Sequence, residues 1–193
     1  MVTFTQIVGF LLAAILLTAS PGPDNLMVLG MGMSKGRRQG IAFGLGCALG
    51  CLSHTALAVI GVSAIVAASS PMAFSVLKWT GGAYLIWLGI QALRSTGASE
   101  IGTSNGAGRS SVAKLFLNGM FANAINPKVV LFFLSFLPQF VVPAQGNVGL
   151  QLGILGVIFT VQAAILFGLL GYFAGAIGAW MQRQQRASLW LDR

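Results

Sequence analysis

The chain has 193 residues, of which 56% are hydrophobic and only 7% carry a charge. Soluble domains contain about 25% charged residues, so lipid rather than water must surround most of this chain. The composition excludes a soluble enzyme and a nucleic-acid-binding module. The net charge of +8 comes largely from basic residues in the gaps between apolar stretches, where they orient a membrane protein.

Five stretches are long and apolar enough to cross a bilayer, which takes about 20 residues. They cover residues 4–33, 40–68, 72–94, 112–137 and 148–180. The first is too long for the core of a signal peptide and begins with no basic residue, so we interpret it as a retained span. The sequence predicts an all-α integral membrane protein.

Basic residues give the orientation of these spans. Lys and Arg lie in or beside the gaps after the first, third and fifth stretches, and the gaps after the second and fourth contain none. Because cytoplasmic loops are enriched in Lys and Arg, the odd-numbered gaps are expected to be cytoplasmic. The N-terminus is then outside and Arg193 inside.

The chain is predicted to form a single transmembrane domain over residues 1–193, made of two related halves. A cytoplasmic linker at 96–111, rich in Gly and Ser, separates repeat one (1–95) from an incomplete repeat two (112–193). The first span of each half carries proline near its middle. Three spans per half would invert the second copy, and paired broken helices in inverted halves are the best sequence pointer to a transporter site.

The proline breaks supply unpaired backbone groups inside the membrane. Pro21 and Pro23 are expected to free the carbonyls of Leu17 and Ala19, and Pro127 has the same effect in the fourth span. Each break also opens a half-helix whose first N–H groups have no helical partner. Carbonyl acceptors beside N–H donors suit an amino-acid zwitterion.

Two charged residues belong to these breaks. Asp24 and Lys128 each lie about ten residues from a span end, which is roughly 15 Å deep at about 1.5 Å per residue. A lone charge at that depth costs roughly 3 kcal/mol or more. We therefore predict that Asp24 and Lys128 approach each other, either paired directly or bridged by substrate.

The candidate site residues come mainly from the two breaks. Substrate binding is assigned to Pro21, Gly22, Pro23, Asp24, Asn25, Asn123, Asn126, Pro127 and Lys128. Proton coupling is assigned to Asp24 and His54, although a hydrogen bond between helices is an alternative role for His54. Gln162 is interpreted as a polar contact between helices, and Cys47 and Cys51 as small residues for close helix contact.

Four motifs together carry a family resemblance: SPGPDN at 20–25, KGRRQG at 35–40, YLIWLG at 84–89 and NAINPK at 123–128. Over nearly the whole chain they resemble the LysE/RhtB family of bacterial amino-acid exporters. The resemblance implies an inner-membrane transporter, not an enzyme, that exports an amino acid or close derivative in exchange for protons. Neutral amino acids are favoured, and a homodimer is one state open to it. Family members have a three-plus-three inverted plan, so a sixth span would be expected to begin near residue 187.

The working hypothesis is alternating access around a site where the two broken spans meet. A divalent-cation exporter of related architecture is one alternative, although one Asp beside a Lys makes a poor dication site. A thiol-electron carrier is another, although its cysteines would be expected on different helices. We expect neither a cofactor nor a bound metal.

Overall fold

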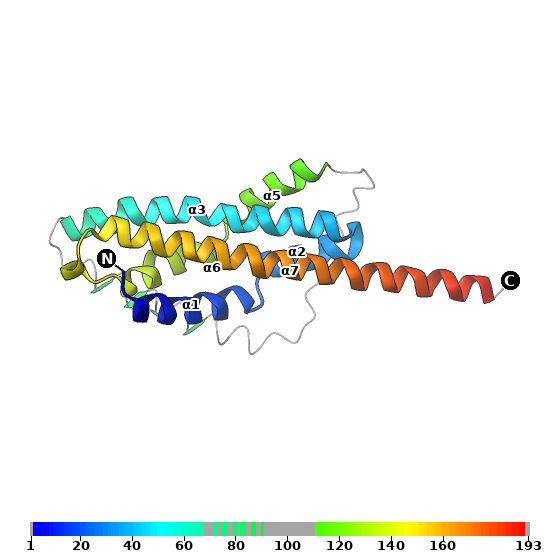
Figure 1. The fold of residues 1–193 in the computed structure, drawn as a ribbon, viewed down its shortest axis with the longest axis horizontal. Helices are drawn as coiled ribbons and strands as arrows, with labels where there is room; N and C mark the ends of the chain where they lie inside the picture. The colour runs from blue at the N-terminus through cyan, green and yellow to red at the C-terminus, as the bar shows by residue number, and fades with distance from the viewer. Residues whose placement is uncertain are drawn as a thin grey trace.

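The computed structural model describes residues 2–67 and 111–191, together with single positions between 72 and 90. Every regular element within these ranges is helical (Figure 1). The helices form an elongated bundle, in which the first helix begins toward one end and the last helix runs along the bundle and projects beyond its other end (Figure 1). The prediction of an all-helical protein is confirmed for this part of the chain.

The first predicted span is a bent pair of helices. Helix α1 (Phe4–Ala19) begins at a Thr3 cap, and helix α2 (Pro23–Lys35) follows at an angle of 57°. The backbone at Ser20 is extended, which ends α1. Pro23 occupies the first position of α2, where its missing N–H removes no helical hydrogen bond.

A second bent pair covers the predicted span at 112–137. Helix α5 (Val112–Ala124) begins at a Ser111 cap, and the chain bends by 52° into helix α6 (Pro127–Leu131). A π-helical turn, η1 (Phe132–Phe136), and a 3-10 turn, η2 (Leu137–Phe140), continue α6. A further 3-10 turn, η3 (Pro143–Gln145), leads to the last helix.

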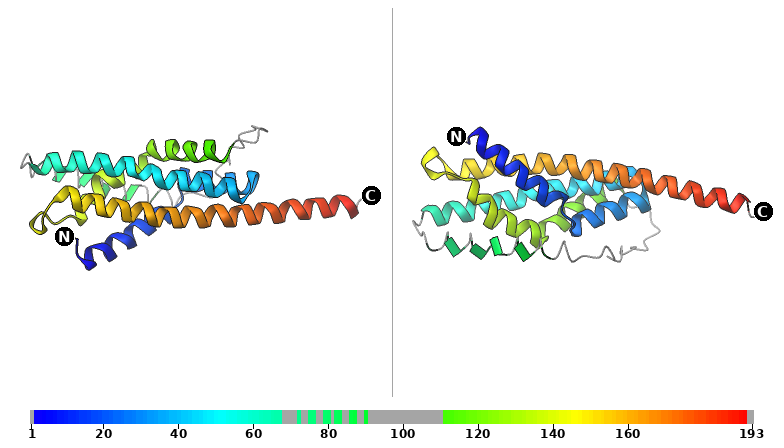
Figure 2. Two further views of the ribbon diagram at one scale, coloured as in Figure 1. Left: turned by 45° about the horizontal axis from the view of Figure 1, so that its top comes forward. Right: turned by 90° about the horizontal axis from the view of Figure 1, so that it is seen from below.

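Helices α3 (Arg37–Ala67) and α7 (Val148–Leu191) lie side by side and antiparallel along the bundle (Figures 1 and 2). By length and composition these two helices can cross a membrane, and the described part of the chain holds up to four spans if each bent pair counts as one. Residues 187–191 continue α7, so no separate helix begins there. Most of the predicted span at 72–94 and nearly all of the linker at 96–111 lie outside the described residues.

Glycines bring several of the helices into close contact. A Cβ on Gly40 of α3 would lie 2.8 Å from the Gly32 Cα of α2 and 3.0 Å from the Gly171 carbonyl oxygen of α7. A Cβ on Gly50 would lie 2.8 Å from the Asn123 Cβ of α5. Small residues at such contacts let helix backbones approach closely inside a membrane.

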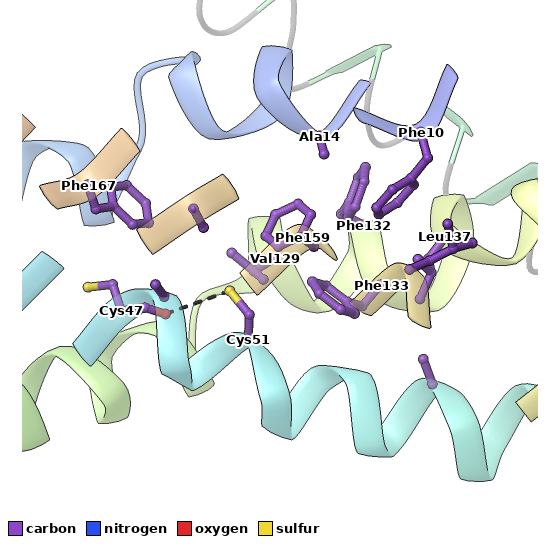
Figure 3. Packing of buried hydrophobic residues seen from close by; sticks show 14 of the residues in the cluster. Phe10, Ala14, Cys47, Cys51, Val129, Phe132, Phe133, Leu137, Phe159 and Phe167 are labelled. Carbon is purple, nitrogen blue, oxygen red and sulfur yellow. Dashed lines mark hydrogen bonds between the residues drawn. The ribbon is translucent and has the colours of Figure 1, made fainter. Parts of the chain in front are cut away.

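Phenylalanine rings from several elements pack against one another. The ring centroids of Phe133 and Phe159 are 4.9 Å apart, and those of Phe10 and Phe140 are 5.4 Å apart. Figure 3 shows rings from α1, η1 and α7 meeting in this cluster. We call it the phenylalanine cluster: Phe10, Phe132, Phe133, Phe136, Phe140 and Phe159. The phenylalanine cluster therefore joins α1, η1, η2 and α7.

Candidate functional site

The two helix breaks lie against each other, and Lys128 joins them. Its Nζ donates a hydrogen bond to the Ser20 carbonyl oxygen at 2.8 Å. Lys128 also crosses Gly22, where an added Cβ would lie 3.2 Å from the ammonium nitrogen. The second break thus supplies the ammonium of Lys128, which binds a backbone carbonyl of the first break. Gly22 has no side chain and so leaves room for Lys128.

The carbonyl that Lys128 uses differs from the ones predicted from the prolines. We expected Leu17 and Ala19 to be the freed acceptors, but the Ser20 hydroxyl donates to the Leu17 carbonyl at 2.8 Å. The extended backbone at Ser20 directs its carbonyl away from the helix ladder and toward Lys128. The carbonyl that binds Lys128 therefore lies one residue after Ala19 and three residues after Leu17.

Asp24 is buried at the start of α2, with only 3% of its surface exposed. One carboxylate oxygen, Oδ2, accepts a hydrogen bond from the Asn123 side-chain amide at 2.7 Å. The other oxygen, Oδ1, has no partner among the described residues. An unpartnered buried carboxylate oxygen is costly, and it is an acceptor for any cationic donor that enters.

Asp24 and Lys128 border the same cavity, in agreement with the predicted approach. Within the described ranges no direct ion pair joins them; each is bonded across the breaks instead, Lys128 to Ser20 and Asp24 to Asn123. Of the two arrangements considered from sequence, direct pairing is not observed. Both groups keep hydrogen-bonding capacity for a molecule placed between them.

Asn123 links the carboxylate to two side chains of α3. The Asn123 backbone carbonyl lies 3.0 Å from His54 Nε2, and its side-chain oxygen accepts a hydrogen bond from the Cys51 thiol at 3.5 Å. His54 is 2% exposed, and its Nδ1 has no partner in the described part of the chain. The interhelical hydrogen bond considered for His54 is therefore present, and His54 reaches Asp24 through Asn123.

The N-termini of the two half-helices are not equivalent, contrary to expectation. At α6 the Asn126 side chain accepts a hydrogen bond from the Lys128 backbone N–H at 3.0 Å and so caps the helix. At α2 the capping position is Gly22, which has no side chain to supply an acceptor. The uncapped N-terminus at Pro23 is thus the one better suited to receive an anion.

The cavity between the breaks is lined by both polar and apolar residues. Polar or small residues at its wall are Thr18, Gly22, Asp24, Asn25, Cys51, Asn123, Asn126 and Lys128. Apolar residues at its wall are Leu17, Val129, Phe159 and Phe167. Its volume of about 20 Å³ has room for about one water molecule, so a larger guest requires the helices to separate.

Most predicted site residues meet at this cavity. Gly22, Asp24, Asn25, Asn123, Asn126 and Lys128 line it. Pro21, Pro23 and Pro127 are not lining residues, and His54 lies one hydrogen bond away. Sequence reasoning did not assign the wall residues Thr18, Cys51, Phe159 and Phe167 to the site. Thr18 precedes the first break by a few residues, which was the available signal.

Two observations bear on the alternative chemistries. Within the described ranges no three His, Cys, Asp or Glu side chains gather in a way that would hold a metal ion. Cys47 and Cys51 are free buried thiols on the same helix, and the Cys51 thiol lies 3.6 Å from the Cys47 carbonyl oxygen (Figure 3). Neither observation favours cation export or electron transfer.

Comparison with known proteins gives several relatives. The chain is 34% identical over 180 residues to the homoserine/homoserine lactone efflux protein of Salmonella typhimurium, covering 93% of this chain and 85% of that protein. It is 29% identical over 146 residues to the leucine efflux protein of an Enterobacter species, covering 76% and 66%. An uncharacterized membrane protein of Vibrio cholerae is 34% identical over 161 residues, covering 83% and 77%. No solved structure matches.

The family model for LysE type translocators matches residues 15–192. This range contains both proline breaks, both long helices and every residue that lines the cavity. The chain therefore belongs to the LysE type translocator family, whose members are transporters and not enzymes.

Proposed function

We propose that this protein exports a neutral amino acid or close derivative from the cytoplasm in exchange for protons, in the inner membrane of a bacterium. The observation that carries the proposal is the pair of opposite charges at one cavity, Asp24 and Lys128, which are not bonded to each other. An α-amino acid carries both charges a few ångströms apart, so it can satisfy both groups at once. The names of two relatives, homoserine/homoserine lactone efflux protein and leucine efflux protein, support this substrate class.

In the proposed binding mode the substrate ammonium lies at Asp24 Oδ1. The substrate carboxylate lies at Lys128 and at the uncapped N-terminus of α2, which begins at Pro23. An ammonium has three N–H donors, so Lys128 can keep its bond to Ser20 and still donate to a carboxylate. Neutral amino acids fit best because the apolar wall offers no second charge to a side chain.

Proton coupling is proposed to act at Asp24. Protonation from outside removes the charge that holds the substrate ammonium and releases the substrate outward, and loss of the proton to the inside resets the site. His54 is positioned to influence this step because it contacts the Asn123 residue that bonds Asp24. The Asp24 carboxylate and the His54 imidazole are thus the two proposed proton-carrying groups.

The transport cycle is proposed to be alternating access within an inverted-repeat architecture. The bent pairs α1–α2 and α5–α6 run in opposite directions along the bundle, and each is followed by a long helix (Figure 1). That order supports two inverted halves, with repeat one at 1–95, the linker at 96–111 and repeat two at 112–193. The proposal places the N-terminus outside and allows a homodimer.

The decisive experiment measures efflux of a radiolabelled amino-acid panel from loaded cells, with and without an imposed pH gradient. We expect the wild type to export at least one neutral amino acid, and Asp24→Asn and Lys128→Met to reduce that export at least tenfold at equal membrane abundance. Lys114→Met is the matched control because Lys114 is exposed on α5. Export that is unchanged in Asp24→Asn, including its response to pH, would overturn the coupling proposal.

A further inference from the structure

Gln162 of α7 carries an unpaired polar atom beside the cavity. Its side chain is 7% exposed, and its amide nitrogen donates a hydrogen bond to the Thr18 hydroxyl of α1 at 2.9 Å. The amide oxygen Oε1 is buried and has no partner in the described part of the chain. Buried amide oxygens nearly always have a partner, so this atom calls for an explanation beyond helix contact.

Thr18 connects this atom to the cavity, because Thr18 is a wall residue and Gln162 is bonded to its hydroxyl. Two further polar wall residues, outside the proposed ammonium and carboxylate sites, are already engaged: Asn25 donates to the Thr18 carbonyl at 2.9 Å, and Asn126 caps α6. The neighbouring wall positions on α7, Phe159 and Phe167, are apolar. The Thr18–Gln162 pair is therefore a polar point beside an otherwise apolar stretch of the wall.

We propose that the Thr18–Gln162 pair recognises a hydroxyl group on the side chain of the transported amino acid. The substrate hydroxyl donates to Gln162 Oε1 and accepts a hydrogen bond from the Thr18 hydroxyl. An amide and a hydroxyl offer both donors and acceptors, which is what a hydroxyl group needs for full pairing. This inference rests on the proposed function and narrows its substrate class to amino acids with a short hydroxylated side chain.

A hydrogen bond to the substrate hydroxyl affects selectivity between substrates more than overall affinity. A wall that hydrogen-bonds a substrate hydroxyl discriminates strongly against an analogue that lacks it, because the polar groups of the protein then stay unpaired. The cavity has to widen to admit a guest, and the same separation of α1 from α7 exposes Gln162 Oε1. A side chain of matched shape without the hydroxyl leaves Gln162 Oε1 unpaired.

The test compares export of homoserine with export of norvaline, in which a methyl group replaces the hydroxyl. We expect the wild type to export homoserine in preference to norvaline. In the double variant Thr18→Val/Gln162→Leu the ratio of homoserine export to norvaline export should fall about tenfold, while norvaline is still exported. The double variant removes both partners at once, so no new unpaired group is buried. Thr18→Ser keeps the hydroxyl and should keep the preference.

Thr160→Val is the matched control, because the Thr160 hydroxyl bonds to the Gly156 carbonyl of its own helix at 3.0 Å. It should leave the homoserine-to-norvaline ratio unchanged. A double variant that lowers export of both substrates equally would show that the pair only holds α1 to α7, and would overturn the inference. Equal export of both substrates by the wild type would do the same. A wild type that exports no amino acid at all contradicts the proposed function instead.

Discussion

The side-chain amide of Asn123 donates a hydrogen bond of 2.7 Å to the carboxylate of Asp24, 99 positions away in the sequence. Asn123 lies in the last turn of α5, just before the second break, and Asp24 lies in the first turn of α2, just after the first break. This bond and the bond from Lys128 to Ser20 connect the breaks in both directions. The two interruptions behave as one polar unit inside an apolar bundle.

Removing the Asn123 side chain should reduce export at least tenfold. Asn123→Ala leaves Asp24 without its donor, and an unpaired buried carboxylate costs about 1–3 kcal/mol or more. Efflux in loaded cells, normalised to membrane abundance, measures the effect. Asn118→Ala is the matched control, since Asn118 is exposed on the same helix. Equal export by the two variants would show that the Asn123 side chain is not needed for the function of the site.

A methyl group at Gly50 should destabilise the protein. The added Cβ would lie 2.8 Å from both the Asn123 Cβ and the Met120 carbonyl oxygen, so α3 and α5 must move apart. We expect a loss of about 1–3 kcal/mol, measured as a lower melting temperature in detergent. Gly61→Ala on the same helix meets nothing within 4 Å, and it should be neutral or slightly stabilising because Ala favours helix. A Gly50→Ala protein as stable as Gly61→Ala would contradict the close contact.

Small thiol reagents should distinguish the two cysteines. Cys51 borders the cavity and Cys47 does not, although both are buried. A protein that keeps only Cys51, made by Cys47→Ala, is therefore expected to lose export on treatment with methyl methanethiosulfonate, and added substrate should slow the loss. The protein that keeps only Cys47 should resist.

Replacing both cysteines by Ala should preserve most export, because neither thiol has a chemical role in the proposed mechanism. Faster inactivation through Cys47 than through Cys51 would conflict with the position of the cavity wall. Complete loss of export in the double variant at normal abundance would reopen the electron-transfer alternative.

Gln151 should contribute strongly to the stability of the loop before α7. Its side chain accepts from the Val142 N–H at 3.1 Å and donates to the carbonyls of Val142 and Gly146 at 3.0 and 3.3 Å. Gln151→Leu leaves these backbone groups unpaired and should cost about 2–4 kcal/mol. Gln139→Leu removes a single bond, to the Ser135 carbonyl, and should cost about 1 kcal/mol. Similar melting temperatures for the two variants would contradict this account.

Sequence reasoning located the breaks because proline acts locally: it lacks an N–H and crowds the preceding turn wherever it occurs. The approach of Asp24 to Lys128 could also be predicted from the sequence, because an isolated charge inside a membrane is costly and tends to pair. The acceptor that Lys128 binds could not be predicted from the sequence, because it depends on the extended backbone at Ser20. The apolar wall was missed for a similar reason. Phe159 and Phe167 face the cavity because of the way α7 is rotated about its own axis relative to its neighbours. The sequence alone does not give that rotation.

The π-helical turn directly after α6 has a consequence for comparing this chain with its relatives. A π turn closes i→i+5 hydrogen bonds, so it holds one residue more than the α turn it replaces. Deleting one residue from Phe132–Phe136 would restore an ordinary ladder while keeping Lys128 and η2 on their present sides of the helix. A relative that is one residue shorter at this point, and shows an apparent gap in alignment, can therefore have the same site.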